Sequence, residues 1–361
     1  MKKVVISTGG GDAPGLNAVI YAVVHACYRL GWEVYGSRSG YAGFLDIDEM
    51  IRLTPRDVQE IYAIGGTILG STNKGSPFAK PVENLAGEIK MVDISDKIMK
   101  NYKRMGFYCH IAIGGDGSLE IAHRFAKLGM NVIGVPKTID NDLMATDRTF
   151  GFDTAVSTAT EALDKLHSTA KSHDRVMVVE VMGRESGWIA LYSGISGGAD
   201  VILIPEIPFD LERVSEKIAD NELREKHYSI VVVAEGALAK GGEIISKGKG
   251  ELGREEVILG GIGEWVATEI RAMTGKDTRS LTLGHLQRGG SPTTFDRLLA
   301  LRFGAAAVRL VETGTFDHMV ALDSSQMKAV PIEEAIKNRK KVDLASDKLT
   351  TARDIGICFG D

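Results

Sequence analysis

The fold is decided by the stretch VVISTGGGDAPG at residues 4–15. A short β-branched run ends in three glycines, and after Pro14 the apolar residues recur at helical spacing from Leu16 to Leu30, before Gly31. This pattern is typical of a buried strand, a glycine-rich turn, and a helix that begins after proline and ends before glycine. A strand followed directly by a helix is the repeating unit of an α/β fold.

Further apolar, β-branched runs predict more strands, at residues 110–113, 132–135, 176–181, 201–204 and 230–234. Because segments with helical spacing lie between them, we expect parallel-rich sheets with helices on both faces. At 361 residues the chain exceeds the usual size of a single core, which predicts two Rossmann-like lobes with the active site in a cleft between them. Ligands of such sheets bind beyond the carboxyl ends of the strands.

The composition is that of an ordinary globular protein. Apolar residues make up 44% of the chain, charged residues 25%, and the net charge is -5, so nothing predicts nucleic acid or an anionic membrane as a partner. Cys27, Cys109 and Cys358 are widely spaced and form no CxxC pair, which indicates reduced thiols. No apolar run has the length of a signal-peptide core or a membrane span, so we expect a cytoplasmic protein.

Two glycine clusters follow predicted strands, Gly9-Gly10-Gly11 and GGDGS at 114–118. Glycines let the backbone approach a phosphate, and a helix N-terminus favours an anion. A carboxylate within such a turn suits Mg²⁺ that bridges phosphate oxygens, which predicts a magnesium ligand at Asp116. The alternatives are a tight turn without a ligand and a helix cap at Asp116.

The third cluster is PKTIDND at 136–142, after the strand that ends at Val135. Asp140 and Asp142 in one irregular segment suit a general base and an orienting group, which is most of what phosphoryl transfer requires of a protein. On composition alone, the alternative of a polar turn that bonds its own backbone is favoured.

A fourth set is cationic and is suited to a phosphate monoester. Arg175 and Arg184 flank the strand at 176–181, and Arg279, His285 and Arg288 lie further along the chain. Glu235 follows the strand at 230–234 and suits sugar hydroxyls. Taken singly, each of these is as well explained by a surface, capping or core role.

Four segments follow one another in the order GGDGS at 114–118, TIDND at 138–142, VEVMGR at 179–184 and GHLQRGGSP at 284–292. Together they resemble the phosphofructokinase family over nearly the whole chain. The resemblance implies phosphorylation of fructose 6-phosphate at its 1-hydroxyl, with Asp140 as base, Thr138 and Asp142 beside it, and Arg184 stabilising the transferring group. It also implies a donor and Mg²⁺ site and a sugar-phosphate site. The donor site comprises Gly11, Gly115, Asp116, Gly117 and Ser118, and the sugar-phosphate site comprises Thr138, Asp140, Met182, Gly183, Arg184, Glu235, His285 and Arg288.

The resemblance also implies an arrangement of lobes and subunits. Residues 1–150 with about 288–325 are expected to bind the donor, and residues 151–287 with about 326–361 the sugar phosphate. Arg175 and Arg279 are expected to reach the site of a neighbouring subunit, in a homotetramer or homodimer with shared active sites. Tyr21, His25 and His167 stand where effector-binding members have basic residues, so we expect a weak response to ADP or phosphoenolpyruvate, or none.

Two positions give opposite indications about the donor. Gly117 is the residue of ATP-using members, whereas Lys137 is that of pyrophosphate-using members. We favour ATP, because an aspartate in place of Gly117 would repel the donor's α-phosphate, whereas Lys137 adds a cation near the transferring phosphoryl group, where a catalytic role is expected, without blocking a nucleoside. Asn73 stands where ATP-type members place a bridging arginine, and Lys74 or Lys137 supplies that charge.

Other classes of protein fit less well. Kinases of NAD or diacylglycerol share GGDG but lack TIDND and MGR in this arrangement, and no GxGxxG of a dinucleotide oxidoreductase follows the first strand. The chain could instead be a non-catalytic sugar-phosphate sensor, against which the intact Asp116, Asp140 and Arg184 argue. Nothing in the sequence closes the site to sedoheptulose 7-phosphate.

Overall fold

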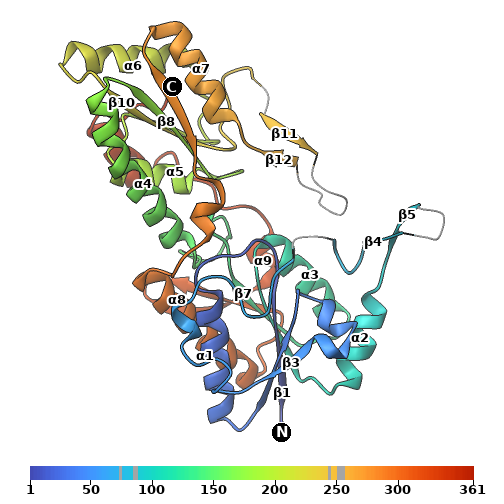
Figure 1. The fold of residues 1–361 in the computed structure, drawn as a ribbon. Coiled ribbons are helices and arrows are strands. Elements are labelled where there is room, and N and C mark those ends of the chain that lie inside the picture. Colours follow the sequence, from blue (N-terminus) through green and yellow to red (C-terminus); the bar gives the residue numbers. More distant parts are fainter. Residues whose placement is uncertain (73–74, 84–87, 243–244, 250–256) are drawn as a thin grey trace. The chain divides into compact units, whose positions relative to one another are not determined.

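The structure, a computed structural model, describes residues 1–72, 75–83, 88–242, 245–249 and 257–361 (Figure 1). The chain divides into two compact units. The first holds residues 1–153 and 288–338, and the second holds residues 154–249, 257–287 and 339–361. Which lobe binds which substrate stays a prediction.

The first unit is built on a seven-stranded sheet in the order β15-β14-β7-β6-β1-β2-β3. Its strands are β1 (Lys3–Thr8), β2 (Glu33–Ser37), β3 (Met50–Leu53), β6 (Cys109–Gly114), β7 (Val132–Pro136), β14 (His318–Asp323) and β15 (Gln326–Pro331). Neighbouring strands run parallel except at the two edges of the sheet, where β3 pairs antiparallel with β2 and β15 pairs antiparallel with β14. The ribbon of β4 (Lys80–Glu83) and β5 (Ile89–Val92) forms a separate antiparallel pair.

Helices cover both faces of this sheet, so its central strands are apolar on both sides. On β1, Val4 and Ile6 belong to one core cluster, with residues of α1 (Leu16–Arg29) and α8 (Thr294–Thr313). Val5 belongs to the other, with residues of α2 (Ser95–Arg104), α3 (Asp116–Lys127) and α9 (Ile332–Ile336). The two faces explain why the strand reads as a continuous apolar run. Helices α1 and α8 lie side by side (Figure 1).

The second unit contains a four-stranded parallel sheet in the order β13-β8-β10-β9. The strands are β8 (Val176–Val181), β9 (Val201–Leu203), β10 (Ser229–Ala234) and β13 (Thr278–Thr282). The helices are α4 (Phe152–Ser172), which begins within the first unit, α5 (Trp188–Ser196), α6 (Leu211–Leu223), α7 (Ile262–Thr274) and α10 (Asp347–Asp354). A two-stranded ribbon, β11 (Ser246–Lys249) with β12 (Val257–Leu259), precedes α7.

The predicted α/β class with parallel-rich sheets flanked by helices is confirmed. All six strands expected from the sequence are present, and α1 begins at Leu16, directly after the glycine-rich turn. Cys27, Cys109 and Cys358 are free thiols, and burial raises the pKa of Cys27 to about 12. None of the helices within the described ranges is long and apolar enough to cross a membrane.

His110 on β6 is a buried titratable group in the first unit. It is 0% exposed, and its Nε2 atom lies 2.7 Å from the hydroxyl of Ser7 on β1. The rings of Tyr41 and Phe44 each pack 5.4 Å from the imidazole. Burial lowers the pKa of His110 to about 3, so the ring is neutral in the folded state.

This burial predicts a loss of stability on mild acidification. The unfolded histidine binds a proton below about pH 6.5 and the folded one does not, so the free energy of unfolding falls as the pH falls from 6.5 towards 3. Between pH 6.5 and 5 the loss amounts to about 2 kcal/mol, before most carboxylates titrate. Urea unfolding at each pH measures it.

His110→Gln removes this contribution, whereas His173→Gln, at an exposed position, is the matched control. Between pH 6.5 and 5, we expect the free energy of unfolding to depend less on pH in His110→Gln, and to keep its wild-type dependence in His173→Gln. Equal slopes in wild type and His110→Gln would show that the buried imidazole does not govern acid sensitivity.

Candidate active site

The two glycine clusters lie next to each other at one edge of the first sheet. Strands β1 and β6 are parallel neighbours with Thr8 opposite Ile113, so both end at the same level. The N–H of Gly9 donates to the carbonyl of Ile113 at 2.9 Å. Turns that are about a hundred residues apart in the sequence are thereby joined at the carboxyl ends of their strands, where ligands of parallel sheets bind.

Ser118 on α3 packs between the two turns. A Cβ atom on Gly9 would lie 2.6 Å from the Ser118 hydroxyl, and one on Gly114 would lie 2.2 Å from its Cβ. Only glycine allows these backbones to approach so closely. The contact explains why both positions are glycine, and the predicted donor contact of Ser118 stays a prediction.

The segment before Asn73 completes the first turn. The N–H of Gly10 donates to the carbonyl of Thr72 at 2.9 Å, and the hydroxyl of Ser71 donates to the carbonyl of Gly10 at 2.5 Å. Sequence reasoning missed Ser71 and Thr72, although both adjoin the predicted donor residues. Asn73 and Lys74 lie outside the described residues.

Two cationic side chains bind the next carbonyls of this turn. Lys137 Nζ donates to the carbonyl of Gly11, and Arg288 Nη1 donates to that of Asp12 at 3.1 Å. A Cβ atom on Gly11 would lie 2.8 Å from Arg288 Nη1. Lys137 is 3% exposed, whereas Arg288 is half-buried.

The ammonium of Lys137 lies among several charges. Burial lowers the pKa of Lys137 to about 8, and the guanidinium of Arg288 acts in the same direction. Asp12, Asp140 and Asp116 act in the opposite direction and favour the charged form. Asp116 and Asp140, both predicted site residues, and Asp12, which was not predicted, therefore all stabilise one buried cation.

Helix α3 begins at Asp116, and its N-cap residue is Gly115 in an extended conformation. Asp116 thus lies in the first turn of the helix rather than at the cap. A Cβ atom on Gly117 would meet nothing within 4 Å, so this position borders open space. The helix N-terminus, the carboxylate of Asp116 and this space together suit an anionic ligand with its cation.

The predicted catalytic segment is held by its own polar groups. The N–H of Lys137 donates to the carbonyl of Gly114 at 2.9 Å, and the N–H of Asp140 donates to the hydroxyl of Thr138 at 3.1 Å. Asn141 is left-handed at φ 52°, and its Oδ1 accepts the N–H of Thr149 at 3.1 Å. Asp140 is half-buried with its Oδ1 atom buried, and Asp142 is half-buried.

In the second unit, the ends of β8 and β10 meet. The N–H of Glu235 donates to the carbonyl of Val181 at 2.9 Å, and that of Gly236 to Gly183 at 3.1 Å. Gly183 has φ 140°, and a Cβ atom on Gly236 would lie 1.8 Å from the Arg184 carbonyl oxygen. Met182, Gly183, Arg184 and Glu235 are thus brought to one edge of this sheet.

Arg175 and Arg279 share one carboxylate. Arg175 Nε lies 2.6 Å from Asp277 Oδ2, and Arg279 pairs with Asp277 Oδ1. Hydrogen bonding by Arg175, aided by the charge of Arg279, lowers the pKa of Asp277. Sequence reasoning missed Asp277, because its role depends on tertiary placement beside both arginines. His285, in the short helix η4 (Gly284–Arg288), is exposed.

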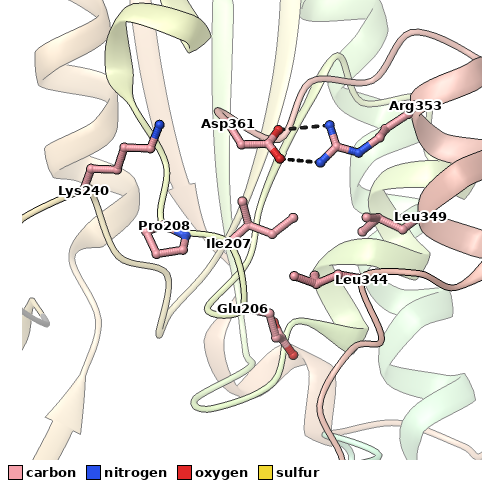
Figure 2. Close-up of a pocket in the computed structure, with 8 residues that line it drawn as sticks. All are labelled: Glu206, Ile207, Pro208, Lys240, Leu344, Leu349, Arg353 and Asp361. Atoms are coloured by element: carbon pink, nitrogen blue, oxygen red, sulfur yellow. Dashed lines mark hydrogen bonds and ion pairs between the residues drawn. The ribbon is translucent and has the colours of Figure 1, made fainter.

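A cavity of about 610 Å³ lies elsewhere in the second unit (Figure 2). Ile207, Leu344 and Leu349 form an apolar wall, and Arg353 pairs with Asp361 at the rim. None of the residues predicted for the site lines this cavity.

Glycine-rich turns at the carboxyl ends of parallel strands, with acidic and cationic residues beside them, are typical of α/β proteins that bind phosphorylated ligands. The sequence pattern of the phosphofructokinase family matches residues 3–311. The chain is 50% identical over 360 residues to the ATP-dependent 6-phosphofructokinase of Chloroflexus aggregans, covering 100% of this chain and 98% of that protein. It is 47% identical to ATP-dependent 6-phosphofructokinase 2 of Clostridium perfringens, covering 100% and 99%. The chain belongs to the phosphofructokinase family.

Solved structures agree with the fold. The phosphofructokinase of Pichia pastoris in the T-state has a TM-score of 0.80 at 31% identity, covering 98% of this chain and 36% of that chain. The pyrophosphate-dependent phosphofructokinase of Marinobacter aquaeolei has a TM-score of 0.80 at 23% identity, covering 100% and 93%, and this likeness concerns the fold alone.

The open space at Gly117 predicts a charge-sensitive donor site. An aspartate there lies in the first turn of a helix, which tolerates acidic residues, so Gly117→Asp folds. If this helix end is the donor site, the added carboxylate would face the donor's phosphates, and we expect kcat/KM for ATP to fall by about a hundredfold, since like charges in contact cost several kcal/mol. Steady-state kinetics measures the fall.

Gly117→Asn adds a side chain of the same size without the charge and is the matched control. A much smaller loss in Gly117→Asn assigns the effect to charge. Unchanged ATP kinetics in Gly117→Asp would contradict a donor site at this helix end.

Proposed function

We propose that this protein transfers the terminal phosphoryl group of ATP to the 1-hydroxyl of fructose 6-phosphate, giving fructose 1,6-bisphosphate in glycolysis. Relatives that match over the whole chain, at 47% to 50% identity, carry the name ATP-dependent 6-phosphofructokinase. We propose the cytoplasm as the location of this protein, because relatives that match over the whole chain carry the name of a glycolytic enzyme.

Within the structure, the observation that supports ATP is the open space beside Gly117. ATP carries a nucleoside and therefore needs room at position 117, where pyrophosphate-using members of the family have an aspartate. The turn around Gly11 and the first turn of α3 supply backbone N–H groups for its phosphates, and both turns lie at the edge formed by β1 and β6.

Mg²⁺ fits the same helix end. Asp116 is an oxygen donor in the first turn of α3, beside the open space at Gly117, and hard cations prefer such oxygens together with phosphate oxygens. When bound, the ion neutralises negative charge on the phosphate chain. Asp116 is the residue that we propose as its protein ligand.

Asp140 is the proposed general base. The proton of the 1-hydroxyl passes to its carboxylate, the hydroxyl oxygen bonds to the γ-phosphorus, and the bond from that phosphorus to the bridging oxygen breaks, so that ADP leaves. Thr138 bonds the N–H of Asp140, which fixes the backbone of the base. Arg184 stabilises the charge that develops on the transferring group, and Asp142 orients the segment.

The sugar phosphate is proposed to bind at the cationic set. Arg175 and Arg279, which share Asp277, are proposed to come from a neighbouring subunit of a homotetramer or homodimer. A planar guanidinium pair matches the oxygens of a phosphate monoester. The remaining contacts are assigned to Met182, Gly183, Glu235, His285 and Arg288.

Pyrophosphate is the second candidate donor. The observation that favours it is Lys137, whose ammonium is buried near Asp116 and Asp140. That ammonium already donates to the carbonyl of Gly11, which weakens the case for direct contact with a donor.

Purified protein assayed with fructose 6-phosphate and each donor in turn distinguishes the two candidates. We expect turnover with ATP and Mg²⁺, and at most a few per cent of it with pyrophosphate. Turnover with pyrophosphate alone would overturn the choice of ATP, and absence of turnover with either donor would favour a sugar-phosphate sensor.

Asp140→Asn tests the base, because asparagine keeps the shape and cannot accept the proton. We expect kcat to fall by about 10²- to 10⁴-fold, with KM for fructose 6-phosphate changed only a few-fold. Asp164→Asn, at an exposed position of α4, is the control and keeps full activity. A kcat within threefold of wild type in Asp140→Asn would exclude Asp140 as the base.

A further inference from the structure

In the first glycine turn, residues 9–12, side chains bind the backbone carbonyls of Gly10, Gly11 and Asp12. These donors come from three separate parts of the sequence. The pairs are Ser71 with Gly10 at 2.5 Å, Lys137 with Gly11, and Arg288 with Asp12 at 3.1 Å. Buried or half-buried carbonyls need such partners, so the direction of each peptide unit in the turn is fixed from outside.

The N–H groups of the turn divide into two pairs. Those of Gly9 and Gly10 donate to backbone carbonyls of the protein, each at 2.9 Å. Within the described part of the chain, the N–H groups of Gly11 and Asp12 take no part in backbone hydrogen bonding. With the carbonyls of the turn already bound by side chains, these two N–H groups are the ones available to an anion.

We infer that Lys137 is a positioning residue for the phosphate donor: together with Arg288 it holds the carbonyls of Gly11 and Asp12, so that the N–H groups of these residues face the donor's phosphates. The inference rests on the proposed function, since it takes ATP as the donor at this turn. It assigns to Lys137 a part different from contact with the transferring phosphoryl group.

Two observations favour action through the turn. Lys137 is 3% exposed, and its Nζ atom would lie 3.2 Å from a Cβ atom on Gly10, so the ammonium is enclosed by the turn itself. Gly10 is left-handed at φ 76°, a conformation that only glycine adopts easily. Gly10 thus lets the turn fold around the ammonium, and the charged hydrogen bond to Gly11 that holds it there is stronger than a neutral one.

A positioning role predicts a particular kinetic pattern. If the N–H groups of Gly11 and Asp12 no longer point at the phosphates, bound ATP and the transition state lose the same contacts. KM for ATP then rises without a matching loss of kcat. A cation in contact with the transferring group would instead stabilise the transition state alone and act on kcat.

Lys137→Met tests this directly, because methionine replaces the aliphatic stem and lacks the ammonium. We expect KM for ATP to rise at least tenfold, kcat to stay within threefold, and KM for fructose 6-phosphate to stay unchanged. Lys127→Met, an exposed lysine at the end of α3, is the matched control and leaves all three unchanged.

A kcat that falls by a larger factor than KM for ATP rises, or a KM within threefold of wild type, overturns the inference. Should Lys137→Met not fold, Arg288→Gln acts on the half-buried partner of the same turn. Its KM for ATP rises at least fivefold if the turn is held as inferred, and a change in KM for fructose 6-phosphate alone overturns it. Wild-type enzyme without ATP-dependent turnover would refute the proposed function instead.

Discussion

The hydrogen bond from the N–H of Gly9 to the carbonyl of Ile113 is the constraint on which the site depends. It continues the parallel pairing of β1 and β6 past the ends of the strands, so that two glycine turns lie edge to edge. Ser118 fits between them only because Gly9 and Gly114 lack side chains. The donor-side residues of the first unit, including Asp116 at the start of α3, are arranged around this junction.

Electrostatics then sets the direction of the turn. An enclosed ammonium is costly unless it is bonded, and Lys137 meets that need with the carbonyl of Gly11. The acidic groups Asp12, Asp116 and Asp140 lower this cost by favouring the charged form. Asp116 and Asp140, which suit a metal ion and a base, thus also stabilise the charged ammonium of Lys137 beside the glycine turn.

Much of the fold could be predicted because the central strands are apolar on both faces and end in glycine or polar clusters. The edge strands β13 and β15 could not. Only one residue of β13 is buried, and β15 has no fully buried residue, so neither shows an apolar run.

The candidate site residues could be predicted from ordered motifs, but the contacts between distant residues could not. Arg288 bonds Asp12 from 276 residues away, and Asp277 joins Arg175 to Arg279. Such contacts depend on tertiary placement, which local pattern does not encode.

We infer that the N–H groups of Gly11 and Asp12, and not those of Gly9 and Gly10, receive the donor's phosphates. Amide NMR of protein labelled with ¹⁵N-glycine and ¹⁵N-aspartate, titrated with a non-hydrolysable ATP analogue and Mg²⁺, measures this directly. We expect large shifts for the amide signals of Gly11 and Asp12 and small ones for Gly9 and Gly10, whose N–H groups already donate to protein carbonyls. Shifts confined to Gly9 and Gly10, or absent from all four signals, would contradict it.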